Sequence, residues 1–181
     1  MVGNATLKIK QILNLAEVYN TKIPVDNWFR DGNSNFGFID ISGEKFKIII
    51  EELNYSFNSK TFNFLNVAFS KIVNGIETQN LTASSKNPSK ILGAIFNAIA
   101  DKLANIDSSN IDAIVFVARD NVNKRMSIYN RMSSNLLNPF NNVLQDVKIP
   151  NGGRMTILLN SKLSTDETNN FINHLKTLEK I

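Results

Sequence analysis

The fold is decided by residues 86–137, with the sequence KNPSKILGAIFNAIADKLANIDSSNIDAIVFVARDNVNKRMSIYNRMSSNLL. Asn87 and Pro88 predict the start of a helix, because Asn is a good N-cap and proline lacks the N–H that a first helical turn leaves unbonded. Apolar residues then recur at helical spacing as far as Leu103, with Gly and Ala filling much of the remaining surface. A helix that is apolar around so much of its circumference is expected in the interior.

A buried strand and a second helix follow this helix. The run at 111–118, IDAIVFVA, is nearly unbroken in its apolar character and is typical of a central strand covered on both faces. The next helix is expected to begin near Asp120 and Asn121. Pro139 is expected to end it, because proline cannot continue a helical hydrogen-bond ladder.

The first part of the chain predicts one helix and then strands. Residues 5–19 carry apolar residues at helical spacing, so that 1–30 is interpreted as an N-terminal helix and a connector. Trp28 and Phe29 lie in this connector and are apolar enough to require cover, from the core or from a partner. The polar tract 30–35 is predicted to be a loop.

Residues 35–83 are rich in strand patterns. Apolar and polar residues alternate on both sides of Ser42 and Gly43, which predicts a β-hairpin. A third run, 61–73, alternates imperfectly, and we expect a bend or bulge near Leu65. A fourth run, 76–83, resembles a half-exposed strand.

The region 140–181 is predicted to hold a hairpin and a C-terminal helix. Strands are expected at 143–149 and 155–159, joined by a tight turn, and a helix is expected to begin at Thr165. No internal repeat or long linker divides the chain. We therefore predict a single α+β domain over 1–181, with a mostly antiparallel sheet and helices packed on one face.

Composition limits the chemistry that the chain can perform. The 181 residues are 43% hydrophobic and 20% charged, with no cysteine and one histidine. Thiolate nucleophiles, disulfides and Cys-ligated metals are thus excluded, and Ser-His-Asp or zinc chemistry is poorly supplied. The N-terminus lacks the continuous apolar stretch of a signal peptide, and no run is long enough to span a bilayer. We expect no metal, no cofactor and no membrane association.

The net charge of +4 is spread along the chain with acids interleaved, so it favours solubility over a nucleic-acid footprint. The best candidate for ligand or partner binding is the basic helix 119–131, with Arg119, Lys124, Arg125, Tyr129 and Arg131. Arg125 and Tyr129 are four residues apart and so share one helix face. A guanidinium suits a carboxylate or phosphate, and a tyrosine stacks or donates a hydrogen bond.

A purely structural interpretation of this helix is favoured over an anion or nucleotide site. In that interpretation Arg125 pairs with an acid such as Asp112, and Tyr129 covers the core with its hydroxyl at the surface. The spacing of one Arg and one Tyr arises easily by chance, which supports this interpretation.

Other candidate sites have simpler structural explanations. The sequence PNGGR at 150–154 suits a hairpin turn better than a phosphate cradle, because it joins two strands. Glu51 and Glu52 are neighbours on a strand and so point to opposite faces. His174 is expected to be solvated on the last helix. Five phenylalanines could form stacking platforms for nucleic acid, although their alternation favours ordinary core: Phe36, Phe38, Phe62, Phe64 and Phe69.

The segment 83–137 resembles a group of proteins encoded by tailed bacteriophages. The matching residues are Ala83-Ser84-Ser85, Ile95-Phe96, Ile114-Val115-Phe116-Val117-Ala118, Arg125, Ile128-Tyr129 and Arg131. The resemblance implies a viral origin and a fold, and it carries over no activity.

These observations lead to two functional hypotheses. The first is a non-enzymatic bacteriophage protein, a structural or interaction component of the virion that binds other phage proteins or itself. The alternative is a host-takeover or anti-defence protein in the host cytoplasm, which captures a nucleotide, nucleic acid or host protein through helix 119–131. No catalytic residue is assigned in either case.

Overall fold

The computed structural model describes residues 25, 27–41, 43–78, 88–119, 122–133, 140, 142–149 and 152–177. The helix predicted over 5–19, the Asn87 cap, the 79–83 end of the fourth run and the helix end at Pro139 lie outside these residues.

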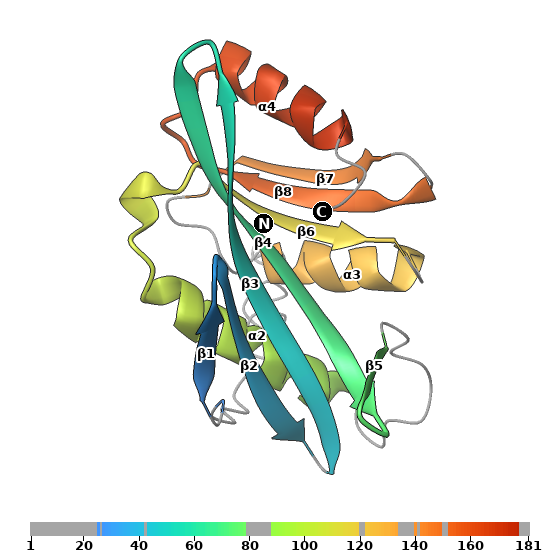
Figure 1. Cartoon of the computed structure of the whole chain (residues 1–181). Coiled ribbons are helices and arrows are strands. Elements are labelled where there is room, and N and C mark those ends of the chain that lie inside the picture. The colour runs from blue at the N-terminus through green and yellow to red at the C-terminus, as the bar shows by residue number, and fades with distance from the viewer. Residues whose placement is uncertain are drawn as a thin grey trace, which may run out of the picture.

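The described strands form one eight-stranded sheet in the order β1-β2-β3-β4-β6-β8-β7, and β5 pairs with one end of β4 outside this order (Figure 1). Every neighbouring pair is antiparallel except β4 and β6, which run parallel. The strands are β1 (Trp28–Asp31), β2 (Ser34–Ile41), β3 (Glu44–Phe57), β4 (Lys60–Val73), β5 (Ile76–Thr78), β6 (Ala113–Ala118), β7 (Asn142–Lys148) and β8 (Arg154–Leu159). The predicted α+β class and mostly antiparallel sheet are confirmed.

The β3–β4 hairpin contains the longest strands of the described sheet, with 14 residues each. Its pairing runs without a register shift from Lys45 opposite Ile72 to Phe57 opposite Lys60. Of the bend or bulge expected near Leu65, the bulge is therefore wrong, and the bend stays a prediction. Phe64 and Leu65 are both buried because the sheet is covered on both faces at that point, so the alternation of burial is lost while the pairing stays regular.

The segment predicted as connector and loop contains a strand instead. β1 pairs with β2 from Trp28 opposite Gly37 to Asp31 opposite Ser34, and Gly32, at φ 55°, turns the chain between them. Gly37 allows the chain to pass closely, because a Cβ there would lie 2.5 Å from Cγ1 of Val25. Tertiary pairing thus overrides the weak local signal of this short strand.

Two helices cover one face of the sheet, which we call the inner face. They are α2 (Pro88–Ala104) and α3 (Val122–Ser133), and both match the prediction. The small residues of α2 allow close contact with the sheet. The cluster beneath these helices includes Ile39, Ile41, Phe46, Ile48, Ile50, Leu65, Val67, Phe69, Ile114, Phe116 and Leu158.

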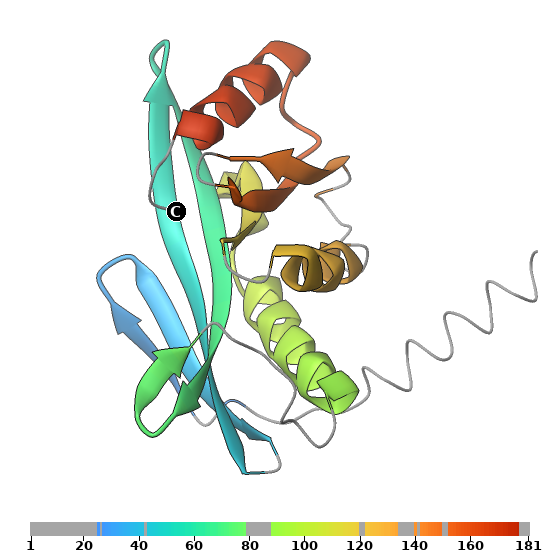
Figure 2. The same ribbon diagram turned by 90° about the vertical axis from the view of Figure 1, so that its right-hand side faces the viewer.

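The third described helix, α4 (Thr165–Thr177), packs on the opposite face, which we call the outer face. Its Phe171 and Leu175 meet a cluster of Phe62, Phe64, Ala113, Val115, Met155, Ile157 and Leu159. β7 and β8 consequently lie between α3 and α4 (Figure 2). The expectation of helices on one face holds for α2 and α3 alone.

Helix α4 covers only the half of the outer face that contains the tip of the β3–β4 hairpin, β6 and β8. The other half of the outer face is formed by β1, β2, β5 and the parts of β3 and β4 that pair with them, and it points away from α2 and α3 (Figure 2). No described helix or strand covers this half. Among the described helices, none is long and apolar enough to cross a bilayer.

Candidate interaction surface

Arg125 and Tyr129, the central residues of the predicted site, are buried between α3 and the sheet. Their exposed fractions are 1% and 0%, and Nη1 of Arg125 donates a hydrogen bond to Oη of Tyr129 at 3.0 Å. The guanidinium lies 5.5 Å from the ring centre of Phe69, and the Tyr129 ring lies 5.3 Å from that of Phe116. The pair is thus part of the interior that joins α3 to β4 and β6.

Burial raises the pKa of Tyr129, although the neighbouring charge of Arg125 acts in the opposite direction. The phenol therefore stays protonated at neutral pH, and its oxygen accepts the bond from the guanidinium. The structural interpretation drawn from the sequence was right about a core role for this face but wrong about the surface position of the hydroxyl.

Asp112 is not the partner of Arg125 but belongs to a separate polar network. Its carboxylate accepts a hydrogen bond from the backbone N–H of Asn63 at 2.8 Å and pairs with Lys162 at 3.0 Å. The predicted Arg125–Asp112 pair is wrong because Asp112 precedes β6 while α3 follows it. A six-residue strand separates the two positions, a length of about 20 Å.

This network joins three strands at one end of the parallel pair. Asp112 N–H donates to the carbonyl of Asn63, and Asn160 N–H donates to the carbonyl of Asp112. The side-chain amide of Asn160 donates to the carbonyl of Ile111 at 2.9 Å. These bonds hold β4, β6 and β8 together, so the buried Asp112 has a structural explanation.

The remaining basic residues of the predicted site do not gather on one described surface. Arg119 directly follows β6, is partly buried, and has an enclosed Nη2 without a hydrogen-bond partner. The side chains of Lys124 and Arg131 lie outside the described set. The anion site at 119–131 therefore stays a prediction, with its central arginine in the interior.

His174 contacts the far end of the β3–β4 hairpin rather than solvent alone. Its ring stacks on that of Tyr55, with centroids 3.5 Å apart and planes at 8°. Burial lowers the pKa of His174. The expectation of a solvated histidine holds only in part, because the ring is partly buried and one of its faces packs on Tyr55 of β3.

Two smaller expectations are confirmed. Glu51 and Glu52 have different partners, since Glu51 accepts a bond from Asn66 and Glu52 from Asn35. The segment at 150–154 connects β7 to β8, with Ile149 N–H donating to the carbonyl of Gly153.

Over the described parts of the chain, no group of three His, Cys, Asp or Glu side chains could hold a metal ion.

The uncovered half of the outer face carries a cluster of aromatic rings. Phe29 of β1 stacks on Phe36 of β2 at 5.5 Å, and Phe38 meets Phe36 edge-on at 6.0 Å. Phe29 is 47% exposed, and Phe36 and Phe38 are half-buried. We define the open face as the outward-facing residues here: Phe29, Phe36, Phe38, Asp40, Lys45, Lys47, Ile49, Glu51, Asn66, Ala68, Ser70, Ile72 and Glu77.

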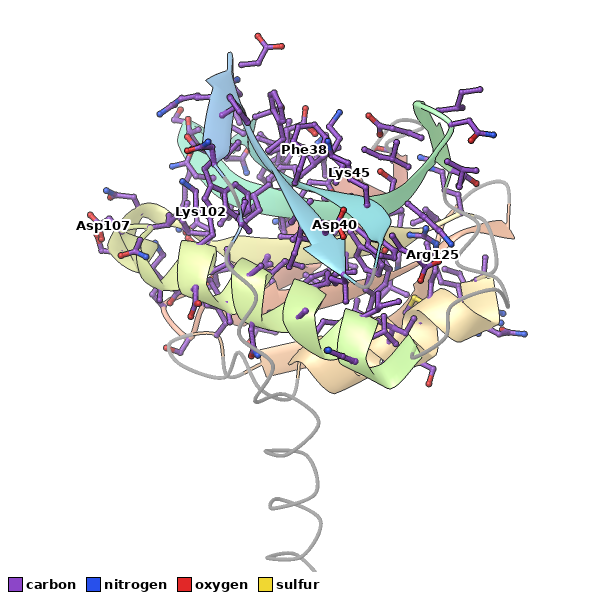
Figure 3. All side chains as sticks on the ribbon, turned by 90° about the horizontal axis from the view of Figure 1, so that it is seen from below. Phe38, Asp40, Lys45, Lys102, Asp107 and Arg125 are labelled. Carbon is purple, nitrogen blue, oxygen red and sulfur yellow. The ribbon has the colours of Figure 1, made fainter. Side chains whose placement is uncertain are left out.

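Charges of both signs surround these rings. The Nζ atoms of Lys45 and Lys47 lie 4.7 and 5.3 Å from the ring centres of Phe38 and Phe36. Lys47 also pairs with Glu77 at 2.6 Å. In Figure 3, Phe38 and Lys45 project on the side of the sheet away from α2, whereas Arg125 lies on the side of the helices.

The open face was only partly predicted. The need of Trp28 and Phe29 for cover was recognised, and the structure buries Trp28 partly against the inner core while Phe29 stays exposed. The strand alternation placed Phe36 and Phe38 in the core with Phe62, Phe64 and Phe69, which is correct for the last three residues only.

Comparison of the chain with protein-family models, curated proteins and solved structures gave no match.

Proposed function

We propose that this protein is a non-enzymatic interaction protein and a structural component of a tailed-bacteriophage virion, with the open face as its assembly surface. The observation that carries the proposal is the Phe29, Phe36 and Phe38 cluster, which lies on the half of the outer face that no described helix or strand covers. Aromatic side chains dominate the energetics of protein interfaces because they bury a large apolar area. The phage resemblance at 83–137 supports the viral setting.

The chemistry of the interior also supports a binding role. The buried Asp112 fixes strand ends, and the buried Arg125 bonds to Tyr129 under α3. Both ionisable groups bond to other groups within the fold. Catalytic groups, in contrast, would have to reach a substrate. The alternative function through helix 119–131 is less well supported, because its central Arg125 is enclosed.

Mass spectrometry of purified particles of the encoding phage tests the proposal. We expect the chain in intact particles at several copies each, and we expect a Phe29→Ser, Phe36→Ser variant to be lost from them. Ile76→Ser is the matched control, since Ile76 is 71% exposed but lies on β5 outside the open face. Absence of the wild-type chain from particles rejects the virion role.

A further inference from the structure

On the open face, two residues of opposite charge lie side by side on neighbouring strands without forming an ion pair. Asp40 of β2 is the register partner of Lys45 of β3. Asp40 accepts a hydrogen bond from the N–H of Gly43, and Lys45 lies over the ring of Phe38. Within the described chain neither residue has an ion-pair partner, so each can pair with a charge on another molecule.

The rings beside this pair provide the apolar part of an interface. Phe29, Phe36 and Phe38 contact one another, yet each keeps part of its surface in water. Transfer of apolar area from water contributes about 25 cal/mol per Å². A partner that covers all three rings at once is thus favoured over isolated contacts.

The charges of the face select the kind of partner. A nucleic-acid backbone requires an excess of Lys or Arg. Here Asp40, Glu51 and Glu77 outnumber Lys45 and Lys47, which disfavours a polyanion. Adjacent charges of opposite sign instead suit a second copy of the same face, because a two-fold axis brings Asp40 of each copy to Lys45 of the other.

The size of the face is compatible with such a pairing. Neighbouring strands lie about 4.8 Å apart and rise about 3.3 Å per residue. The strands that form the open face therefore span a flat area of roughly 500 Å². Side chains raise the accessible area above this value, and a standard interface covers about 800 Å² per partner. A face of this size favours a reversible dimer of moderate affinity.

We propose that the open face joins two copies of this chain about a two-fold axis, with reciprocal Asp40–Lys45 ion pairs beside packed phenylalanine rings. The inference deepens the proposed function and rests on the open face being an assembly surface. It is separable from the virion role, since a chain that is monomeric in solution but present in particles overturns the dimer alone.

Sedimentation velocity of the full chain is the first measurement. We expect a concentration-dependent monomer–dimer equilibrium between about 1 and about 200 μM. Phe36→Ser should shift the equilibrium to the monomer, while Ile76→Ser should leave it unchanged. Circular dichroism establishes that each variant is folded.

Charge variants give the sharper test. Asp40→Lys and Lys45→Asp should each weaken the dimer about tenfold, because like charges then meet at both reciprocal contacts. An equimolar mixture of the two variants should restore dimer to near the wild-type level, since each copy then meets its opposite. A defect within one folded chain cannot be repaired by mixing. Asp40→Asn, which keeps an oxygen for Gly43, should weaken the dimer less than Asp40→Lys.

Each outcome bears on the inference. A monomeric wild type at the highest concentration overturns it, as does a dimer that is indifferent to Phe36→Ser and to both charge reversals. Failure of the mixture to regain dimer overturns the reciprocal pairing. Shift of a fluorescent oligonucleotide by the wild type, with loss on Phe36→Ser, would replace the second copy by a nucleic acid.

Discussion

The imidazole of His174 lies flat on the phenol ring of Tyr55, with ring centroids 3.5 Å apart. This contact attaches α4 to the far end of the β3–β4 hairpin. It places a titratable ring at the joint between a helix and a long strand pair. The stability of that joint consequently depends on pH.

Stability should fall as the pH drops below about 6.5, the ordinary pKa of histidine. Burial lowers the pKa of His174, so the unfolded chain binds its proton more readily than the folded chain. The contribution is fully present above the unfolded pKa and is lost as pH falls through the folded pKa. Thermal melts between pH 5 and 8 measure this loss, and His174→Phe should flatten this part of the profile. As the chain has one histidine, its NMR titration gives the folded pKa directly.

Helix α2 and strand β6 were predictable because their signals are local. Pro88 marks the helix start, and the apolar run through Val115 is too short for a helix and too apolar for an exposed strand. Phe36 and Phe62 show why the rest was not predictable. Both occupy alternating strand positions, yet Phe62 lies under α4 and Phe36 on the open face. Tertiary packing decides which half of the outer face α4 covers, and the alternation pattern of neither strand contains this information.

The candidate site shows the same limit. The four-residue spacing correctly placed Arg125 and Tyr129 together, as their 3.0 Å hydrogen bond shows. It could not tell whether that helix face points to solvent or to the sheet. The apolar residues Met126 and Tyr129 gave the stronger signal, since both are buried on the side of α3 that faces β6 and β8.

Truncation of the Arg125–Tyr129 pair should reduce stability. Tyr129→Phe leaves the buried guanidinium without its phenol acceptor and should cost about 1–3 kcal/mol. Arg125→Ala also opens a cavity and should cost about 3 kcal/mol or more. Urea unfolding measures both, and the double variant should cost less than the sum because the residues share one interaction. A stable Arg125→Ala protein would contradict the structural role and favour the anion site.

Loss of Asp112 should destabilise the junction of β4, β6 and β8. Asp112→Ala removes the acceptor of the Asn63 N–H and the ion-pair partner of Lys162, at a cost of about 3 kcal/mol. Asp107→Ala is the matched control, since Asp107 is exposed and caps only the short 3₁₀ turn η1 (Ser108–Asn110). Urea unfolding should separate the two variants clearly. Equal midpoints would show that the network contributes nothing.

Helix α4 begins with a capping box, and this box should be the acid-sensitive part of the helix. Ser164 N–H donates to Glu167 at 2.8 Å, and Glu167 N–H donates to the Ser164 hydroxyl at 3.3 Å. Ser164→Ala should cost about 1 kcal/mol of stability. The hydrogen bond from Lys60 and those from Ser164 lower the pKa of Glu167 to about 2.

The contribution of Glu167 is therefore present above its unfolded pKa of about 4.5 and is lost as pH falls towards about 2. Glu167→Gln removes the charge that Lys60 pairs with, so the variant should lose less stability than wild type between pH 5 and pH 2. Urea midpoints across this range measure the difference, with Asp166→Asn as the control in the same turn. Parallel profiles for wild type and Glu167→Gln would show that acid acts elsewhere, because only a carboxylate that titrates in this window can change the slope.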